Sequence, residues 1–428
     1  MKKNLNKISQ SLKKNESKSM HGQLPILWTK AKDYYVFDQN DRKLIDFTST
    51  IFVSNVGHSN SRVKKYVIKT IKKDLIHSYN YLTEIRERYL KKLINFTGNN
   101  LSKAFLVSSG TEATEAALKI MRLYALNQKK GPGIICFEGN WHGRTMGAQL
   151  MCSNLSQKKW IGLRDPNIFH LPFPYPWKLE KEDPVIFLKK SLTKLSKKIN
   201  FKKDISGVML ESFQGWGAIF YPKKFIKELE KFCKKNKILI CFDEMQAGFA
   251  RTGYKFGFEY YNVKPDLICC GKGMGGGFPL SGLIGKKKLL DLPGVGDMSS
   301  THSANPVSCA AGLAVIDEIK YKNLVTSTKN KGIILKNLLG NIYNQNKKNI
   351  LAVNSMGLIG AIIFKKEKNL LSKLKKVANA CINDGLLIVH TGRESIKIGP
   401  PLVITKESLI KGMLILEKNI NKYFNDSN

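Results

Sequence analysis

Two short polar segments, each following an apolar run, carry the residue types best suited to chemistry. Asp243 and Glu244 end the run Ile238–Phe242, and Lys272 stands between two glycines after the run Leu267–Cys270. Short apolar runs bounded by polar residues are typical of strands buried on both faces of a parallel sheet. Ligands bind beyond the carboxyl ends of such strands, so we expect Asp243 and Lys272 to share one crevice.

A lysine in this position has two interpretations. It is either a surface lysine in a flexible glycine-rich turn, or a desolvated amine that forms a Schiff base with a carbonyl compound. In the second interpretation a nearby carboxylate pairs with a pyridinium nitrogen, which is the arrangement that pyridoxal phosphate requires. That cofactor also needs a site for its phosphate group.

The segment Ser108–Ala113 offers such a site. Ser109 and Glu112 have the spacing of a capping box, which predicts that a helix begins there. The free N–H groups of the first turn, the helix dipole and the hydroxyl of Thr111 together favour a bound phosphate. The alternative is an ordinary helix cap without a ligand.

Five segments, in this order, resemble the signatures of the class III aminotransferases, which are pyridoxal-phosphate enzymes of fold type I. They read SSGTEATEAALK, FEGNWHGRTMGA, FDEMQAGFARTG, PDLICCGKGMGGG and THSANPVSCAAG. The resemblance extends from about Trp28 to about Thr405. It implies an α/β fold with a large domain, built on a mainly parallel seven-stranded sheet flanked by helices. A smaller α+β C-terminal domain is joined by the N-terminal segment.

The resemblance and the local composition predict four parts of the chain. Residues 1–20 are polar and rich in lysine, which favours a disordered basic arm. Residues 21–59 form an N-terminal segment that packs on the small domain. Residues 60–324 form the large domain that binds the cofactor, and residues 325–428 form the small domain.

The resemblance also assigns roles to individual residues. Lys272 forms the Schiff base and transfers the proton, Asp243 keeps the ring nitrogen protonated, Trp141 stacks on the ring, and Gln246 binds its phenolic oxygen. Thr301 reaches the phosphate of the neighbouring subunit's cofactor, which implies a homodimer with shared active sites. The full set of expected cofactor residues is Ser109, Gly110, Thr111, Trp141, His142, Glu211, Asp243, Gln246, Lys272 and Thr301. No metal site is expected.

The expected substrate pocket departs from the family. Its walls would include Ile51 and Phe52, unless these belong to the core. Where many members have a glutamate this chain has Trp216, and where the partner arginine binds a carboxylate it has Lys397. Lysine cannot form the bidentate contact of arginine, so glutamate and 2-oxoglutarate are doubtful substrates. Arg393 is a candidate to bind the carboxylate instead.

We therefore predict an aminotransferase that moves an amino group from a small amine or amino acid to a keto acid or aldehyde by a ping-pong mechanism. The alternatives within the family are an aminomutase resembling glutamate-1-semialdehyde aminomutase, a decarboxylase or a racemase. A further alternative, from another class of protein, is a basic binding protein on an inactive enzyme scaffold. In that case Lys272 and Asp243 would have no catalytic role.

Charge and cysteine content bear on partners and location. The formal net charge is +38, but only nine of the 71 basic residues are arginines, and the lysines are scattered along amphipathic stretches. This pattern is typical of solvated helix faces, so neither nucleic acid nor a membrane is expected as a partner. The eight cysteines contain no CxxC pair and lie mostly in apolar runs. Together with the absence of a secretory h-region, they favour a cytoplasmic protein.

Overall fold

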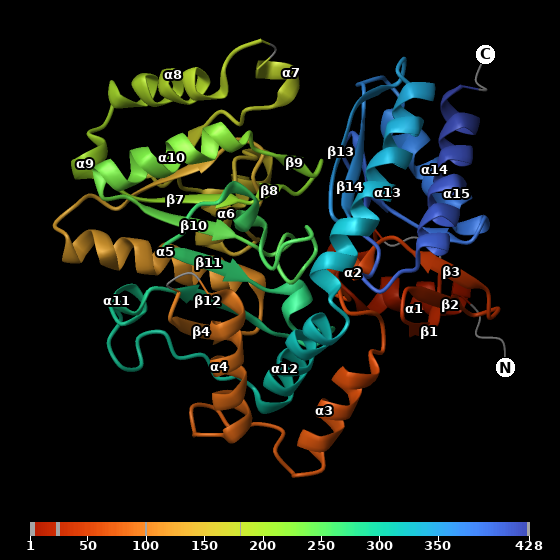
Figure 1. Cartoon of the computed structure of the whole chain (residues 1–428), viewed down its shortest axis with the longest axis horizontal. Helices are drawn as coiled ribbons and strands as arrows, with labels where there is room; N and C mark the ends of the chain where they lie inside the picture. Colours follow the sequence, from red (N-terminus) through yellow and green to blue (C-terminus); the bar gives the residue numbers. More distant parts are fainter. Residues whose placement is uncertain (1–4, 23–25, 99–100, 180, 426–428) are drawn as a thin grey trace.

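A mainly parallel sheet of seven strands forms the larger part of the molecule, on the left in Figure 1. The structure, a computed structural model, describes residues 5–22, 26–98, 101–179 and 181–425. The strand order is β4-β12-β11-β10-β7-β5-β6, and only β12 runs antiparallel to its neighbours. The strands are β4 (Lys103–Val107), β5 (Gly133–Phe137), β6 (Ile168–Leu171), β7 (Ile205–Glu211), β10 (Leu239–Asp243), β11 (Leu267–Cys270) and β12 (Ser281–Gly285). The buried runs predicted from the sequence are therefore strands of one sheet.

Helices cover both faces of this sheet because its side chains alternate between them. Cys241 and Cys269 pack with the buried face of α5, whereas Phe242 and Ile268 belong to the cluster that includes α10. Helices α3 and α4 pack against α12. The helices of this region are α3 (Ser61–Ile71), α4 (Glu84–Thr97), α5 (Gly110–Asn127), α6 (Met146–Met151), α7 (Pro176–Leu179), α8 (Pro184–Ser196), α9 (Phe201–Asp204), α10 (Lys223–Asn236), α11 (Lys287–Leu290) and α12 (Pro306–Tyr321).

Two four-stranded sheets form the right-hand part of Figure 1. One has the order β13-β14-β17-β16, with β13 (Ile350–Met356), β14 (Ile359–Phe364), β16 (Val389–His390) and β17 (Ser395–Ile398). The other has the order β1-β2-β3-β15, with β1 (Trp28–Lys32), β2 (Tyr35–Asp38), β3 (Lys43–Asp46) and β15 (Leu386–Leu387). Since β15 pairs with β3, the N-terminal and C-terminal segments share a sheet. Helices α13 (Leu324–Gln345), α14 (Leu370–Asn383) and α15 (Lys406–Phe424) accompany them.

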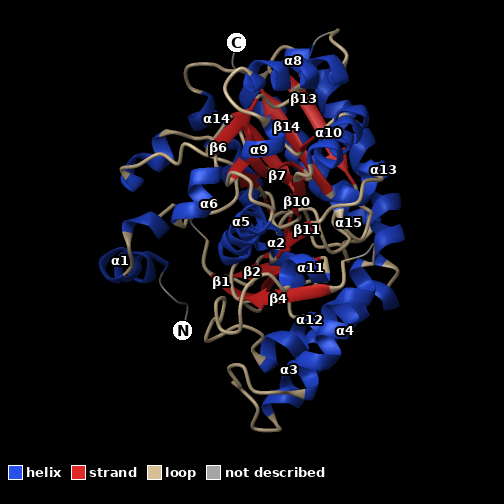
Figure 2. Cartoon of the chain, turned by 90° about the vertical axis from the view of Figure 1, so that its left-hand side faces the viewer, coloured by secondary structure: helices blue, strands red, loops and turns tan. Residues whose placement is uncertain are grey.

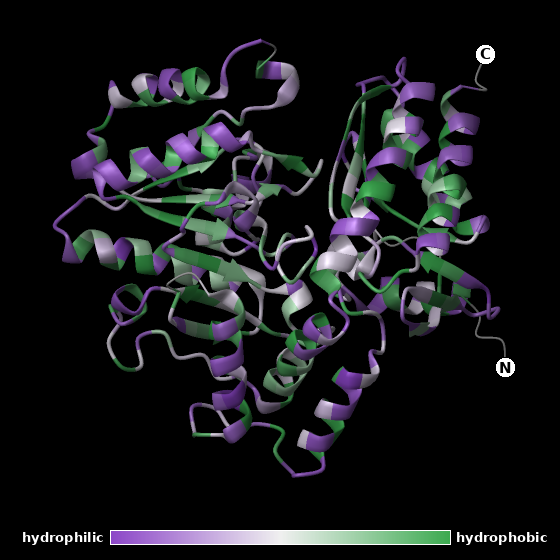
Figure 3. Ribbon diagram, in the orientation of Figure 1, coloured by the Kyte–Doolittle hydropathy of each residue, from purple (hydrophilic) through white to green (hydrophobic). Residues whose placement is uncertain are grey.

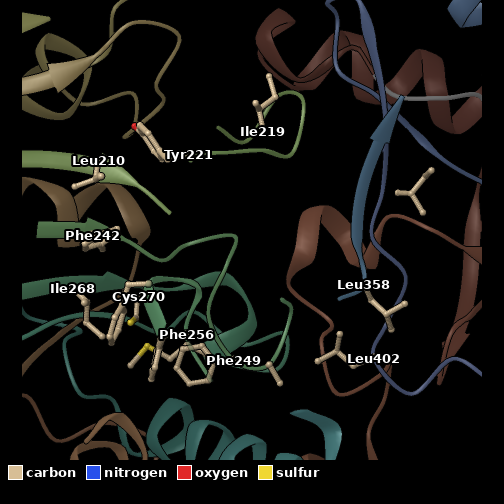
Figure 4. Close-up of a cluster of buried hydrophobic side chains, with 14 of the residues drawn as sticks. Leu210, Ile219, Tyr221, Phe242, Phe249, Phe256, Ile268, Cys270, Leu358 and Leu402 are labelled. Carbon is tan, nitrogen blue, oxygen red and sulfur yellow. The ribbon is translucent and has the colours of Figure 1, made fainter. Parts of the chain in front are cut away.

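The distribution of hydropathy explains this packing. Figure 3 shows hydrophobic strands in the large sheet and helices that carry hydrophilic residues along part of their surface. Apolar residues from the large sheet, such as Leu210, Phe242 and Ile268, belong to the same buried cluster as Leu358 and Leu402 of the C-terminal part (Figure 4). The two parts of the molecule are therefore joined by a shared apolar core.

The N-terminal arm differs from its prediction. Leu5–Asn15 forms helix α1, although a disordered arm is predicted over residues 1–20; residues 1–4 lie outside the described chain. Figure 2 shows α1 standing apart from the sheets, and none of its residues is buried. Leu5, Ile8 and Leu12 recur at helical spacing. The lysines in the last turn of α1 stabilise the helix because their positive charges lie at the negative end of its dipole.

Helix α2 (Ser49–Phe52) is an unusual turn. All four of its residues have positive φ, from 45° at Ser49 to 68° at Phe52. Left-handed backbone costs about 1–2 kcal/mol for each residue other than glycine, so this turn needs external support. Ser49 Oγ donates to the carbonyl oxygen of Gly399 over 2.6 Å, and the backbone N–H of Val53 donates to the carbonyl oxygen of Ser49 over 2.8 Å.

The support extends to Arg251, which is fully buried. Its Nη1 donates to the carbonyl oxygens of Leu358 and Pro400, and its Nη2 donates to Ser49 Oγ and Asn55 Oδ1, over 2.5 to 3.2 Å. Burial lowers the pKa of Arg251, which still stays protonated near neutrality. The Arg251 side chain thus connects the loop after β10 with the N-terminal segment and the C-terminal part.

We expect Arg251→Met to lower the free energy of unfolding by about 2 to 4 kcal/mol, because four buried acceptors lose their donor. The measurement is the midpoint and slope of urea unfolding followed by circular dichroism. Arg164→Met, at an exposed arginine, is the matched control and should change stability by no more than about 0.5 kcal/mol. Equal stability of the two variants would contradict the role of Arg251.

None of the helices in the described part of the chain combines the length and the apolar character that a membrane crossing requires.

Candidate active site

A cavity of about 160 Å³ lies where the carboxyl ends of the parallel strands meet. Its walls come from the segments that follow β4, β5, β7, β10 and β11, because parallel strands end at one edge of a sheet. The lining residues are Gly110, Thr111, Trp141, His142, Gly143, Glu211, Ser212, Phe213, Asp243, Met245, Gln246, Ala247 and Lys272. The structure thus places Asp243 and Lys272 in one cavity, as the sequence predicts.

Asp243, the last residue of β10, is held by two hydrogen bonds. Its Oδ2 lies 2.9 Å from Nδ1 of His142, and its Oδ1 accepts from the backbone N–H of Met245 over 3.0 Å. Both Asp243 and His142 are buried. When Nδ1 of His142 donates to the carboxylate, the imidazole fixes the direction in which Asp243 faces.

The neighbouring carboxylate, Glu244, serves the fold instead. It accepts from the backbone N–H groups of Gly257 and Phe258 over 2.7 and 2.8 Å, and from the hydroxyl of Ser212. Burial raises its pKa to about 7. The hydroxyl of Ser212 is thus one of the groups that hold the Glu244 carboxylate in place.

Lys272 follows β11 and has a left-handed backbone, with φ of 46°. This conformation is uncommon for a residue with a side chain. The Lys272 side chain lines the cavity, and burial lowers the pKa of its amine, whereas Asp243 and Glu211 act in the opposite direction. A lowered pKa increases the fraction of neutral amine, the form that attacks a carbonyl group.

Glu211, at the end of β7, is a buried carboxyl group beside Asp243. It accepts from the backbone N–H groups of Trp141 and Gly215 over 3.1 and 3.2 Å. Burial raises its pKa to about 8, and the negative charge of Asp243 acts in the same direction. Glu211 thus positions the loop that carries Trp141.

The N-terminus of α5 forms one end of the cavity. Ser109 is the helix cap: its Oγ accepts from the backbone N–H of Glu112, and the Glu112 carboxylate accepts from the N–H groups of Ser108 and Ser109. The predicted capping box is therefore present. Gly110 and Thr111, in the first turn, line the cavity, where the N–H groups have no partner within the helix.

These features fit pyridoxal phosphate. The first turn of α5 offers donors for a phosphate group, and Lys272 offers an amine for the carbonyl carbon. A Cβ atom on Gly143 would lie 2.2 Å from Thr111 Oγ1 and 2.8 Å from Thr111 Cβ, so a side chain at this position would displace Thr111 from the cavity wall. The described residues contain no group of His, Cys, Asp and Glu side chains placed to bind a metal.

Some predicted residues lie outside the cavity wall. Ser109 caps α5, and Thr301 lies on the surface, where its carbonyl oxygen is 3.0 Å from His77 Nε2. Ile51 is 49% exposed, whereas Phe52 is buried, with Lys397 Nζ at 4.4 Å and Arg251 Cζ at 5.5 Å from its ring centroid.

Arg393 and Lys397 occupy different environments. Arg393 is exposed and lies over the ring of Trp216, with 4.1 Å between Cζ and the ring centroid. Trp216 adjoins Trp177 and Tyr175, whose rings are stacked at 5.0 Å. Lys397 is buried, and its Nζ lies 2.6 Å from Oε1 of Gln246, which lines the cavity.

Five lining residues are not predicted from the sequence: Gly143, Ser212, Phe213, Met245 and Ala247. Each adjoins a residue that was singled out or lies two positions from one. Their position just beyond a predicted strand could have identified them, because consecutive residues of each loop form the wall at the carboxyl edge of a sheet.

Comparisons with known proteins agree with this geometry. The family model described as "Aminotransferase class-III" matches residues 17–420. The acetylornithine aminotransferase of Candida glabrata, described as mitochondrial, is 33% identical over 90% of this chain and 88% of its own length. A probable 4-aminobutyrate aminotransferase of Bacillus subtilis is 31% identical over 92% of each chain.

Among solved structures, the taurine:2-oxoglutarate aminotransferase of Bifidobacterium kashiwanohense, in complex with pyridoxal phosphate and glutamate, superposes with a TM-score of 0.90. The two chains are 22% identical, and the match covers 100% of this chain and 99% of the other. The likeness shows a shared fold.

Proposed function

Since the chain belongs to the class III aminotransferases, which have fold type I and use pyridoxal phosphate, we propose that Lys272 and Asp243 are its catalytic residues. The chain is a transaminase: it passes an amino group from a donor to a keto acid or aldehyde acceptor. The observation that carries the proposal is that Lys272 and Asp243 line the same cavity beside the free first turn of α5.

In this proposal each residue acts at a stated place. When bound, pyridoxal phosphate supplies a ring that accepts the electron pair released at the substrate carbon. Asp243, oriented by His142, holds a proton at the ring nitrogen. Lys272 would hold the cofactor and, once its amine is free, would take up on Nζ the proton from the carbon that bears the substrate amine. Trp141 would pack on the ring face, and Gln246 would donate to the ring oxygen.

The donor in this proposal has its amine and an anionic group at opposite ends. The relatives' names support this class, because 4-aminobutyrate carries an amine at one end and a carboxylate at the other. Arg393 is exposed and lies over the ring of Trp216, and its Nη2 is 3.4 Å from Oε1 of Glu394, with which it forms an ion pair that a donor carboxylate would replace. A planar guanidinium binds a carboxylate through two parallel hydrogen bonds.

We expect Arg393→Ala to raise KM for 4-aminobutyrate about 10-fold or more while changing kcat little, because it removes a charged contact made before and during the reaction. Steady-state kinetics over a range of donor concentrations would measure this change. An uncharged primary amine of similar length is the control, and its KM should stay the same. If both donors respond equally, Arg393 does not bind the anionic group.

A homodimer belongs to the same proposal. Thr301 lies outside the cavity wall of its own chain, as expected if the segment around it serves a partner's cofactor. His77 lies 3.0 Å from the carbonyl oxygen of Thr301, and the exposed apolar side chains of the same segment, Ile76, Tyr81 and Leu82, support a contact with a second copy. A cytoplasmic location is also proposed, supported by eight buried cysteines without a disulfide.

The experiment that tests the reaction uses ¹⁵N-labelled 4-aminobutyrate and, in turn, pyruvate and 2-oxoglutarate. A transaminase transfers the label to the second compound and converts the donor to its aldehyde. An aminomutase keeps the label within one molecule, a decarboxylase releases carbon dioxide, and a racemase changes only the configuration of a chiral substrate. If 4-aminobutyrate yields no labelled product with either keto acid, the proposed donor class is wrong.

A further inference from the structure

Lys397 occupies a position that the proposed reaction leaves without a role. It belongs to β17, is 6% exposed, and directs Nζ at the side-chain oxygen of Gln246 over 2.6 Å. The same Nζ lies 4.4 Å from the ring centroid of Phe52. In the described part of the chain no carboxylate forms an ion pair with it. Its closest polar contact is thus an amide that lines the cavity.

This contact fixes the orientation of the Gln246 amide, that is, whether its oxygen or its NH₂ group faces Lys397. An amide has one end that accepts and one end that donates, and a protonated lysine only donates. The oxygen of Gln246 must therefore face Lys397, and the NH₂ group must face away from it. The NH₂ group lies beside Gly215 and near Glu211: a Cβ atom on Gly215 would lie 2.2 Å from Nε2 of Gln246 and 3.0 Å from Oε1 of Glu211, which lines the cavity as Gln246 does.

The charges around Lys397 are mixed. Lys272 and Arg251 disfavour its ammonium form, whereas Glu211 favours it. Burial is the largest influence and lowers the pKa of Lys397 to about 7. Both protonation states have N–H groups that can donate to Gln246. The neutral amine also has a lone pair that accepts from an amide, so the orientation of Gln246 is best enforced below this pKa.

We propose that Lys397 is a positioning residue, which holds the amide of Gln246 with its NH₂ group towards the cavity so that it donates to the ring oxygen of pyridoxal phosphate. The inference rests on the proposed function, because it assigns a task within the same site. It differs from carboxylate binding by Lys397, since here the lysine acts on the cofactor through Gln246 and touches no substrate.

The test compares holoenzymes of the wild type, Lys397→Met, Gln246→Ala and the double variant. Two quantities are measured for each: the dissociation constant of pyridoxal phosphate by equilibrium dialysis, and the pH at which the visible absorbance of the bound cofactor changes. We expect Lys397→Met to weaken cofactor binding about 10-fold and to shift the absorbance titration, because a hydrogen bond to a charged oxygen is lost.

The double variant distinguishes positioning from an independent effect. If Lys397 acts through Gln246, Lys397→Met has no further effect on cofactor binding or absorbance once residue 246 is alanine. If the two effects instead add, or if Lys397→Met changes neither quantity, the inference is wrong. A rise in KM for the keto acid with unchanged cofactor properties would also overturn it and would return Lys397 to the substrate site.

The matched control for lost stability is Lys331→Met. Lys331 is another buried lysine, and its Nζ donates to the carbonyl oxygens of Leu402 and Ile404 over 2.5 and 2.9 Å. Its loss should lower the thermal midpoint and leave the absorbance titration unchanged. If Lys331→Met shifts the titration as much as Lys397→Met, the shift reports general destabilisation, and the inference fails. Failure of the proposed function is recognised separately, because Lys272→Ala would then transfer the amino group as fast as the wild type does.

Discussion

Alanine in place of Lys272 is expected to reduce the rate of amino transfer by at least about 10³-fold. The substitution removes the only amine that the cavity lining offers to the cofactor's carbonyl carbon. It also removes the group that moves the proton at the substrate carbon. The rate should be measured in a single half-reaction with excess donor. The variant and the wild type should carry the same concentration of bound cofactor, because weaker cofactor binding would otherwise lower the measured rate.

Two controls make the Lys272 result specific. Lys130→Ala removes a partly buried lysine whose Nζ donates to backbone carbonyl oxygens far from the cavity, and its rate should stay within a few-fold of the wild type. A small primary amine added to Lys272→Ala should restore part of the rate, because a free base can then reach the same proton. If Lys272→Ala kept the wild-type rate, Lys272 would have no part in the mechanism.

Asp243→Asn is expected to slow the same half-reaction by about 10²- to 10⁴-fold. Asparagine keeps the shape of the side chain and loses the negative charge that keeps the ring nitrogen protonated. It also presents an NH₂ group either to Nδ1 of His142 or to the N–H of Met245, where the carboxylate accepts two hydrogen bonds. Stopped-flow absorbance during the first turnover would measure the loss.

The adjacent carboxylate provides the matched control for Asp243. Glu244→Gln removes a charge one residue away, but Glu244 binds backbone N–H groups of a loop and lies outside the cavity lining. We expect it to lower the free energy of unfolding by about 1 to 3 kcal/mol and to leave the half-reaction rate within a few-fold. If Glu244→Gln slowed the reaction as much as Asp243→Asn, the effect would not be specific to the charge beside the ring.

The parts of the site that follow from one strand and its loop were predictable. Short apolar runs identify β10 and β11, and their polar ends identify Asp243 and Lys272. The capping box at Ser109 and Glu112 is written in four consecutive residues, so the start of α5 was predictable as well. In these cases the physical cause lies within a few residues of the feature.

Features that join distant segments could not be read from the chain alone. The contact of Lys397 with Gln246 spans 151 positions. Arg251 binds Ser49, which lies far before it in the sequence, and Pro400, which lies far after it. Nothing local marks the four left-handed residues of α2, because its composition contains no glycine. Such a turn forms only when hydrogen bonds from elsewhere in the fold compensate its cost.

The left-handed backbone of Lys272 bears on the evolutionary history of the chain. A residue with a side chain is strained there, and its amine is desolvated beside a buried carboxyl group, so this position weakens the fold it belongs to. A lineage that used only the scaffold would gain stability from glycine at this position and would drift towards it. The lysine is therefore the residue that purifying selection for catalysis, rather than for folding, would maintain.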